Sequence, residues 1–134
     1  MKIYEELARL AALSPRQSAI GWNTVTGNRR VVGRSGDHFV ILQSEEILVF
    51  QAEGEFVRIV TAEGPFWTKQ RLRAIQDQSK GEPFERVHRN ALVNLDHVRK
   101  LSPISSQRWL LTLSNSLEIT VSKRQARSIQ KILD

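Results

Sequence analysis

The chain of 134 residues contains no cysteine. A protein without cysteine has no disulfide, no thiolate metal site and no cysteine nucleophile, and it fits a cytoplasmic location. The sequence also lacks any run of the ~18 consecutive apolar residues that a membrane span needs. Its apolar N-terminal stretch is interrupted by Arg9 and lacks the h-region and cleavage site of a signal peptide. We therefore expect a cytoplasmic protein that does not associate with a membrane.

The residue patterns of common catalytic sites are missing as well. The three histidines, His38, His88 and His97, are scattered, and no pair has a metal-ligand spacing such as H-E-x-x-H. There is no G-x-S-x-G elbow, no P-loop and no G-x-G-x-x-G motif. The sequence predicts a protein that is not an enzyme, with no metal site and no cofactor.

Positive charge is present in excess, and it is unevenly distributed. The formal net charge is +6 at pH 7, and residues 84–134 hold nine Lys and Arg against four Asp and Glu. A local excess of cations is expected where phosphate groups are bound, although an ordinary solvated surface has the same composition. RNA is a weaker candidate than DNA, because Trp22, Trp67 and Trp109 fall in core or linker patterns and do not form a stacking platform.

Two regions of the chain differ in pattern. Residues 3–13 place apolar side chains at helical spacing, and Ser14-Pro15 begins a second, short helical piece. Residues 23–36 are polar and contain three glycines, which is typical of a linker. From Asp37 onward, short runs rich in Val, Ile and Phe alternate with turns. The sequence predicts an N-terminal helix and linker over residues 1–34, followed by a β domain over residues 35–134.

The C-terminal third predicts a hairpin followed by a helix. Apolar residues alternate over residues 108–113 and again over 117–121, on either side of the turn at residues 114–116. Ser122 is placed as a helix N-cap, with Gln125 as its capping-box partner. The final helix is amphipathic: its apolar face holds Ala126, Ile129, Ile132 and Leu133, and its cationic face holds Lys123, Arg124, Arg127 and Lys131.

The cations at the start of this helix are well placed to bind phosphate. Lys123 and Arg124 directly follow a strand, at a helix N-terminus whose backbone N–H groups and dipole also attract anions. The alternative is an ordinary solvated helix face. We predict that one face of the helix docks on the sheet and that the other presents its cations.

Residues 84–95 combine apolar anchors with a polar cluster. Val87, Ala91 and Val93 have the pattern of core residues, and His88, Arg89 and Asn90 lie between them. Such a cluster suits a protruding loop. Arg can form a bidentate pair with guanine, and Asn can do so with adenine. For His88 a structural role within the loop is the alternative.

At this segment the sequence resembles a known family. The run FERVHRNALVNLDHVRKL is similar to the F-x-R-x-H-R-S-x-[apolar]-V-N pattern of the LytTR DNA-binding domains. EEILVFQAEGEFVRIVTAEG resembles the opening hairpin of that family, and RWLLTLSNSLEITVSKRQARSIQKIL resembles its closing hairpin and helix. The resemblance covers residues 35–134 in the right order and spacing.

The resemblance implies a mainly β fold: elongated antiparallel β-sheets packed together with short helices, including a C-terminal helix. It also implies that loops at one edge enter successive major grooves. Carried over by position, these loops are residues 53–56, 88–90 and 122–124. Three departures from the family pattern are the acidic residues Glu53 and Glu55, Asn90 in place of Ser, and Lys123 in place of Arg. Lys lacks the planar fork of Arg, so that Arg124 is the candidate for a bidentate contact.

Together these observations predict sequence-specific binding to double-stranded DNA by a transcriptional regulator. The expected DNA-binding residues are His88, Arg89, Asn90, Ser122, Lys123, Arg124, Arg127 and Glu55. Family members usually carry a receiver or other sensory domain before this module, so we expect either a fragment of a larger response regulator or a short stand-alone regulator. A homodimer on DNA remains open. The alternative function is a protein-interaction or dimerisation module that does not bind DNA.

Overall fold

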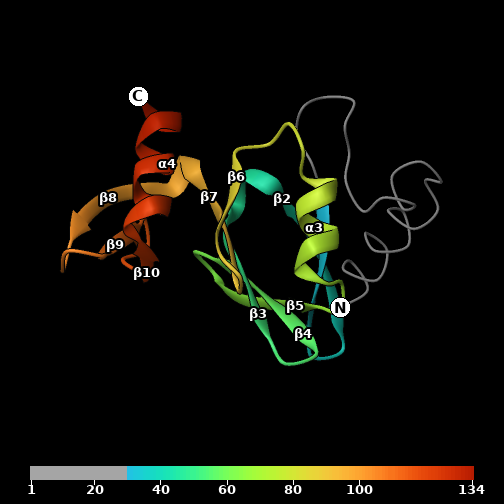
Figure 1. Ribbon diagram of the computed structural model, residues 1–134. Coiled ribbons are helices and arrows are strands. Elements are labelled where there is room, and N and C mark those ends of the chain that lie inside the picture. The colour runs from blue at the N-terminus through green and yellow to red at the C-terminus, as the bar shows by residue number, and fades with distance from the viewer. Residues whose placement is uncertain (1–29) are drawn as a thin grey trace.

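The computed structural model describes residues 30–134, which form ten strands, two α-helices and two short 3₁₀ turns (Figure 1). In chain order these elements are β1 (Arg30–Ser35), β2 (His38–Gln43), η1 (Ser44–Glu46), β3 (Ile47–Glu53), β4 (Phe56–Thr61), β5 (Gly64–Thr68), α3 (Leu72–Gln78), β6 (Phe84–His88), β7 (Ala91–Asn94), η2 (Leu95–His97), β8 (Val98–Pro103), β9 (Arg108–Leu113), β10 (Glu118–Ser122) and α4 (Lys123–Leu133).

The strands form two antiparallel sheets. The first has seven strands in the order β2-β1-β5-β4-β3-β7-β6, and the second has three in the order β10-β9-β8. Helix α3 packs on one face of the seven-stranded sheet, while α4 and the three-stranded sheet lie on its other side (Figure 1). The mainly β architecture of two packed antiparallel sheets with a C-terminal helix confirms the fold class expected from the sequence.

Strands β3 and β7 are apolar on both faces because they lie between two cores. Phe50 and Leu92 face the core under α3, whereas Val49 and Val93 face the core shared with α4 and the second sheet. A strand covered on both sides needs a continuous apolar run in place of strict alternation. The largest fully buried side chains of the core are Phe50, Ile47, Leu48, Ile59, Ile75, Leu92, Leu111, Leu113, Ile129, Val49 and Val87.

One buried polar side chain connects the end of β7 to the start of β3. Asn94 donates from Nδ2 to the carbonyl oxygen of Ile47 at 2.9 Å, and its Oδ1 accepts the backbone N–H of Asp96 at 3.0 Å. Buried polar groups need such partners, because an unpaired one costs on the order of 1–3 kcal/mol. Asn94 therefore satisfies backbone groups at the start of β3 and at the beginning of η2.

The predicted C-terminal hairpin and helix are confirmed. Strands β9 and β10 pair from Arg108–Ser122 to Thr112–Glu118, and Leu111, Leu113 and Val121 are buried on the face that was expected to be apolar. Helix α4 begins directly after Ser122, as the cap predicted.

The linker prediction is wrong for residues 30–34, which belong to strand β1. This strand pairs with β2 along its whole length and meets β5 at Arg34–Trp67. Gly33 is buried in the sheet, and a Cβ there would lie only 2.8 Å from Cβ of Phe66. The glycine therefore allows a close approach between strands, and it is not evidence of a flexible linker. The helix predicted over residues 3–13 lies outside the described residues.

Helix α4 docks with a smaller apolar face than expected. Ala126 and Ile129 are fully buried, but Ile132 and Leu133 are each 52% exposed. The last turn of the helix extends beyond the surface that the second sheet offers, so half of the predicted docking face remains in solvent. In the part of the chain described, no helix is long and apolar enough to cross a bilayer.

Candidate nucleic-acid interface

The turn between β6 and β7 presents three consecutive polar residues to solvent. Val87 and Ala91 are buried on either side of it, and His88, Arg89 and Asn90 are exposed. The apolar anchors belong to the core that includes α4. The structure thus confirms the protruding loop expected from the sequence and places its side chains at the end of two buried strands.

Local hydrogen bonds fix the conformation of this turn. The backbone N–H of Asn90 donates to Nδ1 of His88 at 3.1 Å, and the carbonyl oxygen of Asn90 accepts the backbone N–H of Ala52 at 2.9 Å. Because Nδ1 accepts, the proton of the neutral His88 ring lies on Nε2. His88 thus has a structural role in the turn, as the alternative interpretation of its sequence position held.

The junction between β10 and α4 is fixed by a helix cap. Oγ of Ser122 accepts the backbone N–H of Gln125 at 3.1 Å, and the backbone N–H of Lys123 donates to the carbonyl oxygen of Gln107 at 3.0 Å. Lys123 is partly buried, while Arg124 and Arg127 are exposed. The junction therefore presents cations at the N-terminus of an 11-residue helix.

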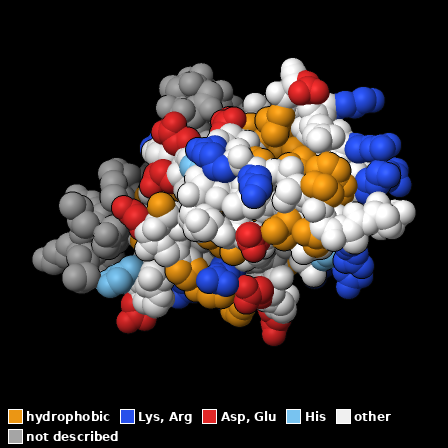
Figure 2. Space-filling view, turned by 90° about the vertical axis from the view of Figure 1, so that its left-hand side faces the viewer, with side chains coloured by type: hydrophobic (Ala, Val, Ile, Leu, Met, Phe, Trp, Pro, Cys, Tyr) orange, Lys and Arg blue, Asp and Glu red, His pale blue; other side chains and the backbone are white. Residues whose placement is uncertain are grey.

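Figure 2 shows the side of the molecule that carries α4 and the three-stranded sheet. Lys and Arg side chains gather along its right-hand margin, whereas most Asp and Glu side chains on this face lie elsewhere. This separation of charge produces a local positive surface on a molecule whose formal net charge is +6. Such a surface attracts polyanions.

The turn between β3 and β4 has the opposite charge. Gly54 has a φ of 61°, and the next residue, Glu55, is exposed. Glu53 forms an ion pair with Arg58 at 3.6 Å between Oε2 and Nη1, so one of the two carboxylates in this turn is partly compensated. Phe56 follows with a side chain that is 44% exposed.

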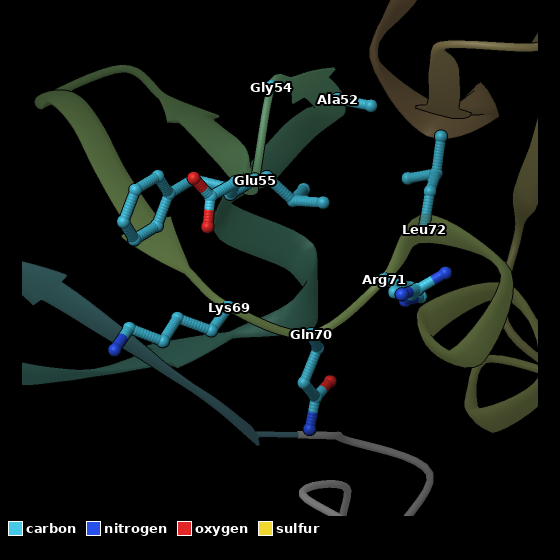
Figure 3. A pocket seen from close by; sticks show the side chains of 9 residues that line it. Ala52, Gly54, Glu55, Lys69, Gln70, Arg71 and Leu72 are labelled. Carbon is cyan, nitrogen blue, oxygen red and sulfur yellow. The ribbon is translucent and has the colours of Figure 1, made fainter.

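A surface pocket of about 620 Å³ separates this acidic turn from the connection between β5 and α3. Glu55 lies on one side of the pocket, and Lys69, Gln70 and Arg71 line the other side (Figure 3). Lys69, Gln70 and Arg71 were not among the residues expected to bind DNA. Their position could not be read from the sequence, since they lie more than a dozen residues from Glu55 and meet it only through the pairing of β4 with β5.

Two of the three candidate segments lie next to each other. The β3–β4 and β6–β7 turns are adjacent, because Gln51 pairs with Ala91 and Ala52 bonds to Asn90. In Figure 1 both turns lie in the lower half of the molecule, and α4 runs upward at the left, beside the three-stranded sheet. Within residues 30–134, no group of three His, Asp or Glu side chains is placed to hold a metal ion.

Comparison with known proteins identifies the family. Residues 37–134 match the family described as LytTR, LytTr DNA-binding domain. The chain is 23% identical over 111 residues to the sensory transduction protein LytT of Bacillus subtilis, covering 83% of this chain and 46% of LytT. It is 27% identical over 128 residues to the positive alginate biosynthesis regulatory protein of Pseudomonas aeruginosa, covering 93% of this chain and 50% of that protein.

A solved structure has the same fold. The LytTr DNA-binding domain of a response regulator from Bacillus cereus matches with a TM-score of 0.70 at 21% sequence identity, over 78% of this chain and 95% of that one. The chain spans about half the length of the curated relatives it matches. Since the family match covers nearly all the described residues, this chain belongs to the LytTR family of DNA-binding domains, whose members are regulators and not enzymes.

Proposed function

We propose that this chain recognises a specific sequence in double-stranded DNA by inserting loops from one edge into the major groove, and that it is the output module of a transcriptional regulator. The observation that carries the proposal is the β6–β7 turn, where three exposed polar residues lie between buried anchors. In this proposal the turn and the cationic N-terminus of α4 face the DNA together. A polar protrusion beside a cationic helix end suits base contacts flanked by phosphate contacts.

Each candidate residue has a distinct chemical role in this proposal. Arg89 forms a bidentate pair with O6 and N7 of guanine, and Asn90 pairs with adenine. Lys123 and Arg127 contact phosphates near the helix N-terminus, where Ser122 maintains the cap, and Arg124 contacts a phosphate or pairs with a guanine edge. Glu55 is the exception, because a carboxylate repels phosphate but can accept a hydrogen bond from N4 of cytosine.

Selection from a random duplex library tests the proposal directly. We expect enrichment of one sequence, and we expect the affinity for it to fall steeply with salt, by a slope of about −0.9 in log K against log salt for each phosphate neutralised. A chain that enriches no sequence and binds duplex DNA no better than a neutral protein of its size does not have this function.

A protein contact is the second candidate function, and Ile132 and Leu133 favour it. Both are 52% exposed at the end of α4, so they offer apolar surface to a second copy or to a preceding sensory domain. We propose light scattering of the chain with and without the selected duplex. An apolar contact of this kind would persist in high salt, whereas DNA binding by cations would not.

A further inference from the structure

Arg86 lies in strand β6, which leads into the β6–β7 turn, and its guanidinium forms hydrogen bonds with the backbone of that turn. Nε donates to the carbonyl oxygen of His88 at 3.1 Å, and Nη2 donates to the carbonyl oxygen of Arg89 at 2.5 Å. The third nitrogen, Nη1, donates to Oε1 of Gln76 at 2.7 Å. One side chain therefore bonds to two successive carbonyl groups of the turn and to helix α3.

These two carbonyl groups can accept from a side chain because the ladder between β6 and β7 is irregular. The pairing shifts between Arg86, which faces Leu92, and His88, which faces Ala91. Backbone carbonyl groups that leave a regular ladder accept hydrogen bonds from side chains or from water instead. A guanidinium offers donors in a fixed, planar arrangement, so that it holds both carbonyl groups in one relative orientation, which a Lys ammonium cannot do.

The contact with Gln76 connects the turn to a rigid part of the fold. Gln76 lies on α3, which is anchored on the seven-stranded sheet by the buried residues Leu72 and Ile75. Hydrogen bonds from a charged donor are stronger than those between neutral groups. The turn, whose apolar anchors Val87 and Ala91 belong to the core that includes α4, is thus also connected to the core that holds α3.

We infer that Arg86 is a positioning residue for DNA recognition. It holds the backbone of the turn in the conformation from which Arg89 and Asn90 present their side chains, so that the turn is ordered before DNA arrives. An interface that is ordered in advance avoids the entropy cost of ordering it on binding. The inference rests on the proposed function, but it assigns Arg86 a role different from that of a phosphate-binding cation.

The test compares variants that separate geometry from charge. Arg86→Lys keeps the charge and removes the planar fork, and Gln76→Ala removes only the contact with α3. Arg99→Lys is the matched control, because Arg99 also donates to backbone carbonyl groups, those of Asp96 and Val98, at the far end of the second sheet from Ser122. Affinities are measured for the selected duplex and for a scrambled duplex over a range of salt concentrations, and the thermal unfolding of each variant is recorded.

We expect Arg86→Lys to lose about tenfold in affinity for the selected duplex, with binding to the scrambled duplex and the salt slope unchanged. Gln76→Ala should lose less, about threefold, and Arg99→Lys should match the wild type. Hydrogen exchange gives a readout without DNA: the amide of Asn90, which is bonded to His88, should exchange faster in Arg86→Lys while amides of α4 are unaffected.

Two results would overturn the inference. If Arg86→Lys binds the selected duplex as the wild type does, the fork is not needed. A further variant, Arg86→Met, removes both the charge and the fork. If it weakens binding to both duplexes equally and lowers the salt slope by about 0.9, Arg86 contacts phosphate instead. If Arg86→Lys fails to fold, Gln76→Ala tests the inference alone, because that substitution lies on α3 and outside strand β6. Failure of the proposed function looks different, since the wild type itself would then enrich no sequence.

Discussion

The β3–β4 and β6–β7 turns lie side by side at one end of the seven-stranded sheet, but they are held in shape in different ways. The β3–β4 turn depends on its backbone, because Gly54 adopts a φ of 61°, a conformation that is unfavourable for residues with a Cβ. In the β6–β7 turn, neither Arg89 nor Asn90 has a positive φ. Its shape depends on side chains, those of Arg86 and His88.

This difference has consequences for how each turn responds to mutation. A turn defined by glycine keeps its shape when the neighbouring side chains change. A turn held by side chains changes shape when a supporting residue is lost, even one that never meets DNA, such as Gln76 on α3. The two turns also differ in charge, with Glu55 exposed in one and Arg89 in the other. We therefore expect recognition to depend mainly on the β6–β7 turn and stability to depend on the glycine of the β3–β4 turn.

The largest effect is expected from Arg89→Ala. If Arg89 pairs with guanine, its removal costs about 1–3 kcal/mol of binding free energy and relaxes specificity at one position of the site. Because the side chain is exposed, the unfolding temperature should hardly change. Selection repeated with the variant measures both the affinity and the lost preference.

The matched control for Arg89→Ala is Lys80→Ala. Lys80 is exposed and follows the C-terminal end of α3, the end that lies away from the β3–β4 and β6–β7 turns (Figure 1). Its removal should change the affinity very little. Equal losses in the two variants would mean that Arg89 contributes only general positive charge, and the assignment of the β6–β7 turn as the base-contacting element would then fail.

Gly54→Ala should act on stability and leave recognition intact. An added Cβ meets nothing within 4 Å, so the cost is that of the left-handed backbone alone, about 1 kcal/mol in the free energy of unfolding. Gly36→Ala is a close control, since Gly36 has a φ of 60° and equally open space in the β1–β2 turn. Urea unfolding measures both. A loss of specific affinity in Gly54→Ala alone would show that the β3–β4 turn contacts bases as well.

His88→Ala tests whether the β6–β7 turn depends on its side chains. The variant removes the acceptor for the backbone N–H of Asn90 and should cost about 0.5–1.5 kcal/mol in specific binding. His88→Asn should recover much of this loss, because an Asn side chain can accept the N–H two residues further on. Titrations with the selected duplex compare the three proteins. Equal losses in both variants would indicate that the imidazole itself contacts DNA.

Features set by neighbouring residues were predicted from the sequence. The hairpin of β9 and β10, the cap at Ser122 and the polar loop at residues 88–90 each depend on short-range patterns of apolar, turn and capping residues. The placing of the loops along one edge came from the family resemblance and stays a prediction. Local patterns are informative here because each element carries its own start and stop residues.

Features set by distant residues were missed or wrong. Gly33 looks like a linker glycine in the sequence, and only the close approach of Phe66 shows that it belongs to a sheet. Arg86 was part of the family pattern and of the count of cations, but its contact with Gln76 was not predicted, because Gln76 lies ten residues away on another element. Ile132 and Leu133 continue the apolar face of α4 beyond the surface that covers it. In each case the outcome depends on which distant residues the fold brings into contact, and the periodicity of the sequence does not encode that.

The smallest effect is expected from Glu55→Gln, which removes a charge and keeps the shape of the side chain. An exposed carboxylate near bound DNA repels phosphate across solvent, so its loss should raise the affinity for any duplex by about twofold at low salt. At high salt the gain in affinity should vanish, because screening shortens the range of the repulsion. Glu63→Gln is the control, since Glu63 is exposed in the β4–β5 turn at the opposite end of β4. If Glu55→Gln instead weakens binding to a site with cytosine at one position, Glu55 accepts a hydrogen bond from that base. The β3–β4 turn would then contribute to specificity together with the β6–β7 turn. The two turns would differ only in how their shape is maintained.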